Sequence, residues 1–277
     1  SQELLIEGTV TRFDWKNPHM YLIVETTGPD GKPALVEGEG LAITQALVDG
    51  LRREALQPGT KVVMRVNPNL GGWGKQVRIR DVTTQDGEIH PFYATSNRTL
   101  KLTPAESLEG HWAPSPAALG AAFGAMASWP VSPQGRAAQS LISDGLCFVE
   151  PTPVLSILDE LRTIEIGNDE VVMHFENTGD HLLRTIHMNA EHPVDIEPSR
   201  HGHATGRWEG DTLVIDTIAY EPNPSGLALN VPSSPGKHTV ERLTLTADRT
   251  RLRYEVTVED PMYLSEPATL TQQWDHR

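Results

Sequence analysis

The chain has 277 residues, 38% of them hydrophobic, which suffices for one large domain or two smaller domains with cores of their own. Its 37 acidic residues outnumber 23 basic ones, and the net charge of -14 repels nucleic acids and anionic lipid surfaces. No apolar run approaches the roughly 18 residues of a membrane span. Cys147 stands alone, which excludes an internal disulfide and a cysteine-rich zinc site. We therefore expect neither a nucleic-acid partner nor membrane insertion.

Residues 1–88 contain five strand-like runs and one helical run. LLIEGTVTRFDW and HMYLIVETT flank the turn Lys16-Asn17-Pro18, and a third run covers residues 34–41. AITQALVDGLRREAL has helical spacing and stops at Pro58-Gly59. KVVMRV and KQVRIRDV follow, on either side of Gly71-Gly72-Trp73-Gly74. Three strands, a helix and two strands predict a small OB-like β-barrel.

Residues 89–104 are predicted as a linker. The Ala/Gly-rich sequence that follows, up to about residue 160, has little periodicity and predicts loops and a short helix. From residue 162 the alternation becomes regular, and turn residues separate the runs 162–167, 170–177, 181–189, 205–209, 212–220, 239–246, 251–260 and 268–274. About eight strands joined as a meander predict an up-and-down antiparallel β-barrel. The expected fold class is thus all-β with minor α.

Four segments carry motifs seen in other proteins: FDWKNPHMYLIVE in the first module, and GHATGRWEGDTLVIDT, HTVERL and TVEDPMY in the second. They resemble a widespread bacterial family, mostly exported and functionally uncharacterised, with a W-x-N-P-H module, a G-x-W strand and a G-R-W-E-G-D-T-L-V-x-D-T hairpin. EGHWAPS at 109–115 looks like the G-x-W strand. The chain departs from the family at Ala204, where relatives often have serine, and at Pro267-Ala268, where they tend to have Pro-Trp. The resemblance implies a periplasmic or secreted location and a lipocalin-like β-barrel domain over residues 105–277.

His201 and His203 form the most distinctive pair of polar residues. On a strand, residues two apart point to the same side, so both imidazoles can face one site. Three interpretations stay open: a metal site with a third ligand from His187, His192 or His238, proton transfer by His203, or hydrogen bonding within a loop. The chain has no H-E-x-x-H motif, paired-cysteine motif or calcium loop. We therefore expect neither a metal nor another cofactor.

Two carboxylates sit on strands near the histidines. Glu241 alternates in phase with Leu243 and Leu245, which predicts an inward carboxylate that must have a partner or hold a proton. Such a group is either a general acid or base, or one half of an internal Glu–Arg pair. Asp216 is either solvent-facing or a pocket carboxylate.

Other candidate residues are assigned to ligand binding. Tyr254 is predicted to point inward on its strand, and His174 can face inward beside Met173 and Phe175. Trp208 lies in the predicted hairpin next to His203. His19 follows the Asn-Pro turn and is not explained by it, so it is a candidate contact to a ligand.

These residues favour a cofactor-independent enzyme of lyase, isomerase or hydrolase type that acts on a mainly apolar small molecule in the second barrel. His203, Glu241 and His238 are the predicted catalytic residues; His201, Trp208, Tyr254, His19 and His174 are the predicted substrate-binding residues. One alternative is a lipocalin-like carrier that binds a ligand without turnover. The other is a metal-dependent enzyme that uses the histidines.

Overall fold

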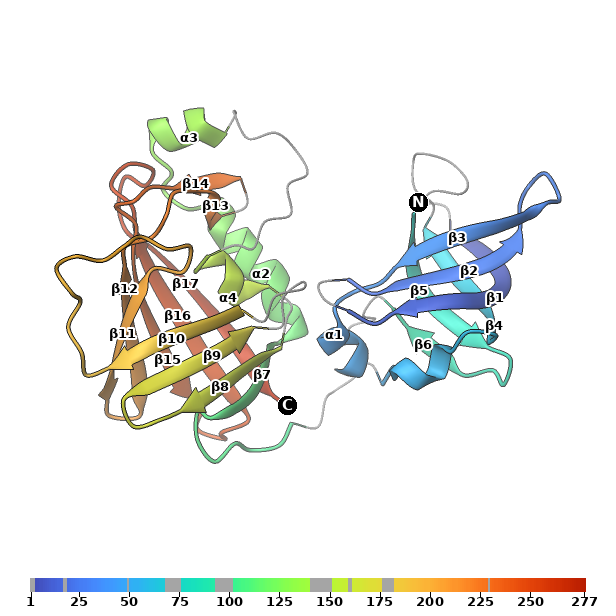
Figure 1. Ribbon diagram of the computed structural model, residues 1–277, viewed down its shortest axis with the longest axis horizontal. Helices are drawn as coiled ribbons and strands as arrows, with labels where there is room; N and C mark the ends of the chain where they lie inside the picture. Colours follow the sequence, from blue (N-terminus) through green and yellow to red (C-terminus); the bar gives the residue numbers. More distant parts are fainter. Residues whose placement is uncertain are drawn as a thin grey trace. The chain divides into compact units, whose positions relative to one another are not determined.

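The computed structural model describes residues 3–16, 19–48, 50–67, 76–92, 102–139, 151–158, 161–175, 182–228 and 230–277. The chain divides into two compact units, and the described residues up to 92 belong to the first, those from 102 to the second. Figure 1 labels the helices and strands of each. The predicted turns at Asn17-Pro18, Gly71-Gly72-Trp73-Gly74 and Thr178-Gly179-Asp180 lie wholly outside the described residues, as does Cys147.

The first unit is a small barrel with a short additional strand. Its sheet has the order β3-β2-β1-β4-β5-β6, and a parallel pairing of β3 with β5 closes the barrel. This confirms the predicted small OB-like barrel. β6 pairs with β5 in a stretch where the sequence predicted a linker. The strands are β1 (Leu4–Asp14), β2 (Tyr21–Thr27), β3 (Pro33–Glu39), β4 (Lys61–Asn67), β5 (Val77–Thr84) and β6 (Ile89–Pro91).

Alternation explains these strands. In β4, Val62, Met64 and Val66 are buried in the core, while the residues between them are partly or fully exposed. The single helix predicted between β3 and β4 is divided into α1 (Ile43–Val48) and a 3-10 helix at Arg53–Leu56. Gly50 lies between them with a φ of 88°, a left-handed conformation that interrupts the helix and that glycine adopts without strain.

The second unit is a closed barrel of nine strands, in the order β10-β11-β12-β15-β16-β17-β7-β8-β9. The prediction of a closed barrel formed by the strands between residues 162 and 274 is confirmed. β7, the predicted G-x-W strand, closes it by pairing with both β17 and β8. The strands are β7 (Gly110–Pro114), β8 (Arg162–Ile166), β9 (Glu170–Phe175), β10 (Leu182–Met188), β11 (His203–Glu209), β12 (Thr212–Ile218), β15 (His238–Leu245), β16 (Arg251–Glu259) and β17 (Ala268–His276).

The barrel differs from a simple meander at two places. β10 and β11 are parallel, because the connection through residues 189–202 returns to the end where β10 began. We call this connection the strap. A small hairpin of β13 (Asn223–Ala228) and β14 (Val231–Ser233), which the sequence analysis did not predict, stands between β12 and β15 in the chain.

Three helices lie between β7 and β8 in sequence: α2 (Pro116–Ala127), α3 (Pro133–Gln139) and α4 (Val154–Ile157). The sequence predicted loops and one short helix here. α2 runs beside the barrel strands in Figure 1 and contacts β17 and β13. Its alanine and glycine residues form no pronounced apolar stripe, so the periodic signal that identifies most surface helices is missing. No helix within the described ranges is long and apolar enough to cross a membrane.

Large side chains pack inside the second barrel. The rings of Tyr254 and Trp274 stack with centroids 4.7 Å apart, and the guanidinium of Arg162 lies 4.6 Å from the Trp274 centroid. Arg162 is buried and donates hydrogen bonds to the carbonyls of Leu155 and Ser156 next to α4. The buried guanidinium of Arg162 is therefore held by backbone carbonyls of α4.

Candidate functional site

The wall formed by β11, β12 and β15 separates the candidate residues into two sets. In the register of these strands, Gly206 lies opposite Ile215, which lies opposite Glu241, and this row faces the buried interior. His203 lies opposite Ile218, an even-numbered position of β12 like Asp216. Because side chains alternate along a strand, His203, Asp216 and His238 share the outer face of the wall.

Four histidines and one carboxylate meet on that outer face. We call them the outer-wall cluster: His187, His192, His203, Asp216 and His238. Nδ1 of His192 is 2.8 Å from Nδ1 of His203, and Nε2 of His192 is 3.0 Å from Oδ1 of Asp216. Nε2 of His238 is 2.9 Å from the other carboxylate oxygen of Asp216. The rings of His187 and His203 stack with centroids 5.1 Å apart.

The hydrogen bonds in the cluster determine which nitrogens carry protons. Asp216 only accepts hydrogen bonds when ionised, so Nε2 of His192 must donate to it. In neutral His192 the other nitrogen, Nδ1, is then an acceptor, and Nδ1 of His203 must donate to it. Nε2 of His203 is left with its lone pair, and none of the described residues hydrogen-bonds to it. The cluster therefore presents an unprotonated imidazole nitrogen.

The pKa values agree with this assignment. Burial, followed by the neighbouring His192 and His187, lowers the pKa of His203 below its ordinary value, so the neutral form is favoured. Burial works to raise the pKa of Asp216, but the hydrogen bonds from His238 and His192 outweigh it, and the pKa is lowered. Asp216 thus stays ionised and orients two imidazoles at once.

His192 reaches the cluster from the strap. The backbone holds the strap at its two ends, where Asn189 N–H donates to the carbonyl of Gly206 and Ser199 N–H donates to the carbonyl of Ala219. The side chain of His192 provides the link between these ends, since it bridges His203 and Asp216. The sequence folds locally so that one strap residue completes a site built by β11, β12 and β15.

Glu241 lies on the opposite, inner face. It is fully buried and forms a two-point ion pair with Arg184, whose Nη1 is 3.0 Å from Oε1. Tyr254 donates a hydrogen bond of 2.9 Å to the same carboxylate, and Nη2 of Arg184 also donates to the hydroxyl of Thr217. Burial opposes the charge of Arg184, yet the adjacent Glu241 raises its pKa above the ordinary value. This is the internal Glu–Arg pair that the sequence left open as an alternative.

The predicted proton-transfer pair of His203 and Glu241 is not formed. The two side chains point to opposite faces of the barrel wall, and direct or water-mediated proton transfer needs contact. His238, the third predicted catalytic residue, is connected to His203 through Asp216 and His192. The prediction paired His203 with Glu241, whereas the structure connects His203 to Asp216 through His192.

His201 is separate from the cluster although it lies only two residues from His203. Gly202, with a φ of 68°, turns the backbone between them. Nδ1 of His201 is buried and has no hydrogen-bond partner among the described residues. Burial, together with the charge of Arg184, lowers the pKa of His201 to about 4. His201 is therefore a neutral residue near the inner ion pair.

The remaining predicted binding residues are scattered. Tyr254 belongs to the interior through Glu241 and Trp274, and Trp208 is 43% exposed. His174 is paired at 3.3 Å with Glu165 on neighbouring β8, and His19 belongs to the first unit, where its Nδ1 is 2.5 Å from Glu39. The structure does not bring these residues into the outer-wall cluster.

Arg184 is the ion-pair partner of Glu241 that the sequence analysis did not identify. It alternates in phase with Ile186 and Met188 on β10, and these positions are buried. An arginine at an inward position requires an inward acid, and Glu241 was already identified as one. Matching these two residues would have predicted the ion pair. The sequence offers His192 as a third metal ligand and Asp216 as a solvent-facing or pocket carboxylate, and the strand pattern does not connect the two residues.

The histidines do not have the geometry of a metal site. Within the described part of the chain, no group of three or more His, Cys, Asp or Glu side chains is arranged to hold a metal ion. In the cluster, both nitrogens of His192 and Nδ1 of His203 are already engaged in hydrogen bonds. What the arrangement offers chemically is a histidine base whose proton positions are fixed by a carboxylate.

The architecture is thus an OB-like barrel followed by a nine-strand barrel that carries a histidine–aspartate cluster on its outer wall. Residues 1–77, which cover most of the first barrel, match a family of unknown function, DUF6152. Comparison with curated proteins gives no match for this chain.

Proposed function

We propose that the second unit is a cofactor-independent acid–base enzyme, of lyase, isomerase or hydrolase type, in which His203 exchanges a proton with a small-molecule substrate. The observation that carries this proposal is the hydrogen-bonded series Asp216–His192–His203, which ends in an unprotonated Nε2. A positioned general base of this kind typically contributes about 10²–10⁴-fold to a rate.

The same hydrogen-bonded series explains how His203 can return the proton to the product. When Nε2 of His203 accepts a proton from the substrate, its Nδ1 proton can move to Nδ1 of His192, which is 2.8 Å away. The positive charge then rests on His192, where Asp216 stabilises it. Reversing both movements delivers the proton from His203 to the product. Lyases and isomerases need this alternation between base and acid.

The substrate in this proposal is a neutral, mainly apolar small molecule, since the net charge of -14 opposes polyanions. A periplasmic or secreted location belongs to the proposal as well, and fractionation of cells that express the natural gene tests it.

The activity is tested with a panel of enolisable ketones, aryl esters and β-substituted carbonyl compounds. His203→Ala should reduce turnover of any active substrate by about 10²-fold or more, and free imidazole should restore part of it. His174→Ala is the matched control, because His174 is also a strand histidine of this barrel beside a carboxylate but lies outside the cluster. Equal turnover of both variants would contradict the proposal.

A further inference from the structure

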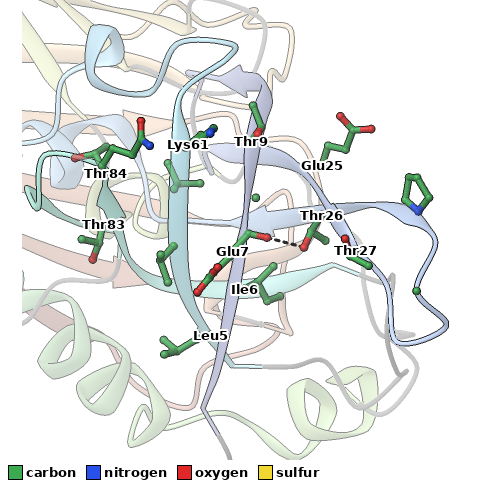
Figure 2. Close-up of a pocket in the computed structure, with 16 residues that line it drawn as sticks. Leu5, Ile6, Glu7, Thr9, Glu25, Thr26, Thr27, Lys61, Thr83 and Thr84 are labelled. Atoms are coloured by element: carbon green, nitrogen blue, oxygen red, sulfur yellow. Dashed lines mark hydrogen bonds between the residues drawn. The ribbon is translucent and has the colours of Figure 1, made fainter.

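The first unit contains a groove of about 860 Å³ on the outside of its barrel. It opens between the first half of β1 and the end of β2 (Figure 2), and its lining includes Leu5, Glu7, Thr9, Thr26, Lys61 and Thr83. β1 pairs with β4 from Leu4 to Thr9 but with β2 only from Thr9 onward. The residues before Thr9 therefore pair with a strand on one side only, and the groove extends across them from β2 to β4 and β5.

Two hydrogen-bond observations show which backbone groups face the groove. The N–H and carbonyl of Val10 pair with Thr60 and Gly59, on the β4 side. The carbonyl of Glu7 accepts a hydrogen bond of 2.6 Å from the Thr26 hydroxyl, on the β2 side (Figure 2). Backbone groups alternate in direction along an antiparallel strand, so the N–H and carbonyl of Leu5 and the N–H of Glu7 also point into the groove.

β2 forms the opposite wall of the groove, and its backbone groups also face the groove. Glu25 of β2 pairs with Thr9 of β1, whereas Gly28 N–H donates to Lys32 on the side of β3. By the same alternation, the backbone groups of Thr27 face the groove. Within the described residues, no strand pairs with Leu4–Gly8 or with Thr27 across this opening. Two diverging strand edges thus present unpaired backbone groups to each other.

The side chains around this edge determine which kind of ligand it prefers. Leu5 is 70% exposed and offers an apolar contact beside the open strand edge. Glu7 and Glu25 contribute two carboxylates against the single ammonium group of Lys61. Backbone donors and acceptors in strand spacing, an apolar contact and excess negative charge together match one kind of ligand.

We infer that this groove binds an extended polypeptide segment, which adds a strand alongside Leu5 and Glu7 of β1 and carries alternating basic and apolar side chains. Main-chain hydrogen bonds would supply the affinity, and the contacts with Leu5, Glu7 and Glu25 would select the sequence. The inference concerns the first unit and is independent of the acid–base function proposed for the second.

The test uses the full chain labelled with ¹⁵N and a blocked heptapeptide of alternating lysine and valine. The amide signals of Leu5, Glu7 and Thr27 should shift on titration, and exchange of the Leu5 and Glu7 amides should slow. Leu5→Pro removes the groove-facing N–H without removing a β4 hydrogen bond, and it should weaken binding at least about tenfold relative to Leu5→Ala. Two further peptides, N-methylated at the odd or at the even residues, test the same point without altering the protein. At least one of them should lose binding.

Three results would overturn the inference. The first is the absence of shifts at Leu5, Glu7 and Thr27 at millimolar peptide. The second is equal affinity of the unaltered chain for both N-methylated peptides and the unmodified one. The third is binding of a neutral linear hexasaccharide in place of the peptide. A glutamate–valine peptide should bind more weakly than the lysine–valine peptide, and equal binding would overturn the preference for a basic partner.

Discussion

Histidine protonation depends on neighbours, and the outer-wall cluster illustrates this at the level of single atoms. Asp216 accepts hydrogen bonds from His192 and His238, and this fixes the tautomer of both rings. Among the described residues, no carboxylate lies within hydrogen-bond distance of His203, so His192 transmits the effect of Asp216 to it. Asp216 therefore orients the base His203 indirectly, through His192.

The pH dependence of the proposed activity follows from the lowered pKa of His203. His203 acts as a base only when neutral, so the rate should rise with pH through a midpoint below 6.5, the ordinary histidine value. A pH–rate profile of kcat/KM measures this midpoint for the free enzyme. Asp216→Asn should alter the profile, because an amide can donate to His192 and reverse its tautomer. A midpoint above 7 would contradict the assigned environment of His203.

Stability should respond to pH through His201. Its pKa is lowered to about 4 in the folded chain from an ordinary 6.5, so the folded state resists protonation. The contribution is fully present above pH 6.5 and is lost as the pH falls towards 4. The loss should amount to about 3 kcal/mol. His201→Gln should remove this part of the pH dependence in urea unfolding, whereas the exposed His111→Gln should leave it unchanged.

At the scale of elements, the wall of β11, β12 and β15 has different chemistry on its two faces. The inner face carries the buried Arg184–Glu241 pair, and the outer face carries the cluster. β12 contributes to both, with Thr217 inward and Asp216 outward. The buried pair connects β10 to β15 across the interior, and the strap crosses the outside.

The buried ion pair should be strongly coupled. Arg184→Met alone leaves the Glu241 carboxylate buried without its partner and should cost about 3–5 kcal/mol of unfolding free energy. Arg184→Met combined with Glu241→Leu removes both charges and should recover most of that loss. Denaturant unfolding of the two single variants and the double variant measures the coupling. Additive losses in the double variant would contradict the pairing.

The sequence predicted most strands of the second barrel, because residues such as Leu213, Ile215 and Thr217 alternate clearly with outward neighbours. It did not predict the face of His203, since the strand was expected to begin at residue 205 and the face of a residue before a strand is undetermined. The register that places His203 opposite Ile218 is a property of strand pairing, which alternation within one strand does not contain. The parallel pairing of β10 and β11 was missed for the same reason.

At the scale of the whole molecule, the chain combines two barrels, each with its own hydrophobic core. The first barrel presents an open strand edge, and the second carries the cluster. The OB-like barrel was predictable because its elements are short and consecutive, while α2 and the β13–β14 hairpin have no pronounced periodicity to identify them.

Two separate cores predict two unfolding transitions. Calorimetry of the full chain should resolve them, and a core substitution such as Met64→Ala should lower only the transition of the first unit, by an amount equivalent to about 2–5 kcal/mol. Leu243→Ala is the matched substitution for the second unit. A single transition that both substitutions shift equally would contradict independent units.

The most direct test of the central claim is the tautomer of His203, read by long-range ¹H–¹⁵N NMR of the full chain at pH 7.5. The structure predicts a protonated Nδ1 and an unprotonated Nε2 on His203, with the opposite tautomer on His192. Asp216→Asn should disturb both assignments, whereas Glu241→Gln on the inner face should leave them unchanged. A proton on Nε2 of His203 in the wild-type protein at that pH would contradict the account.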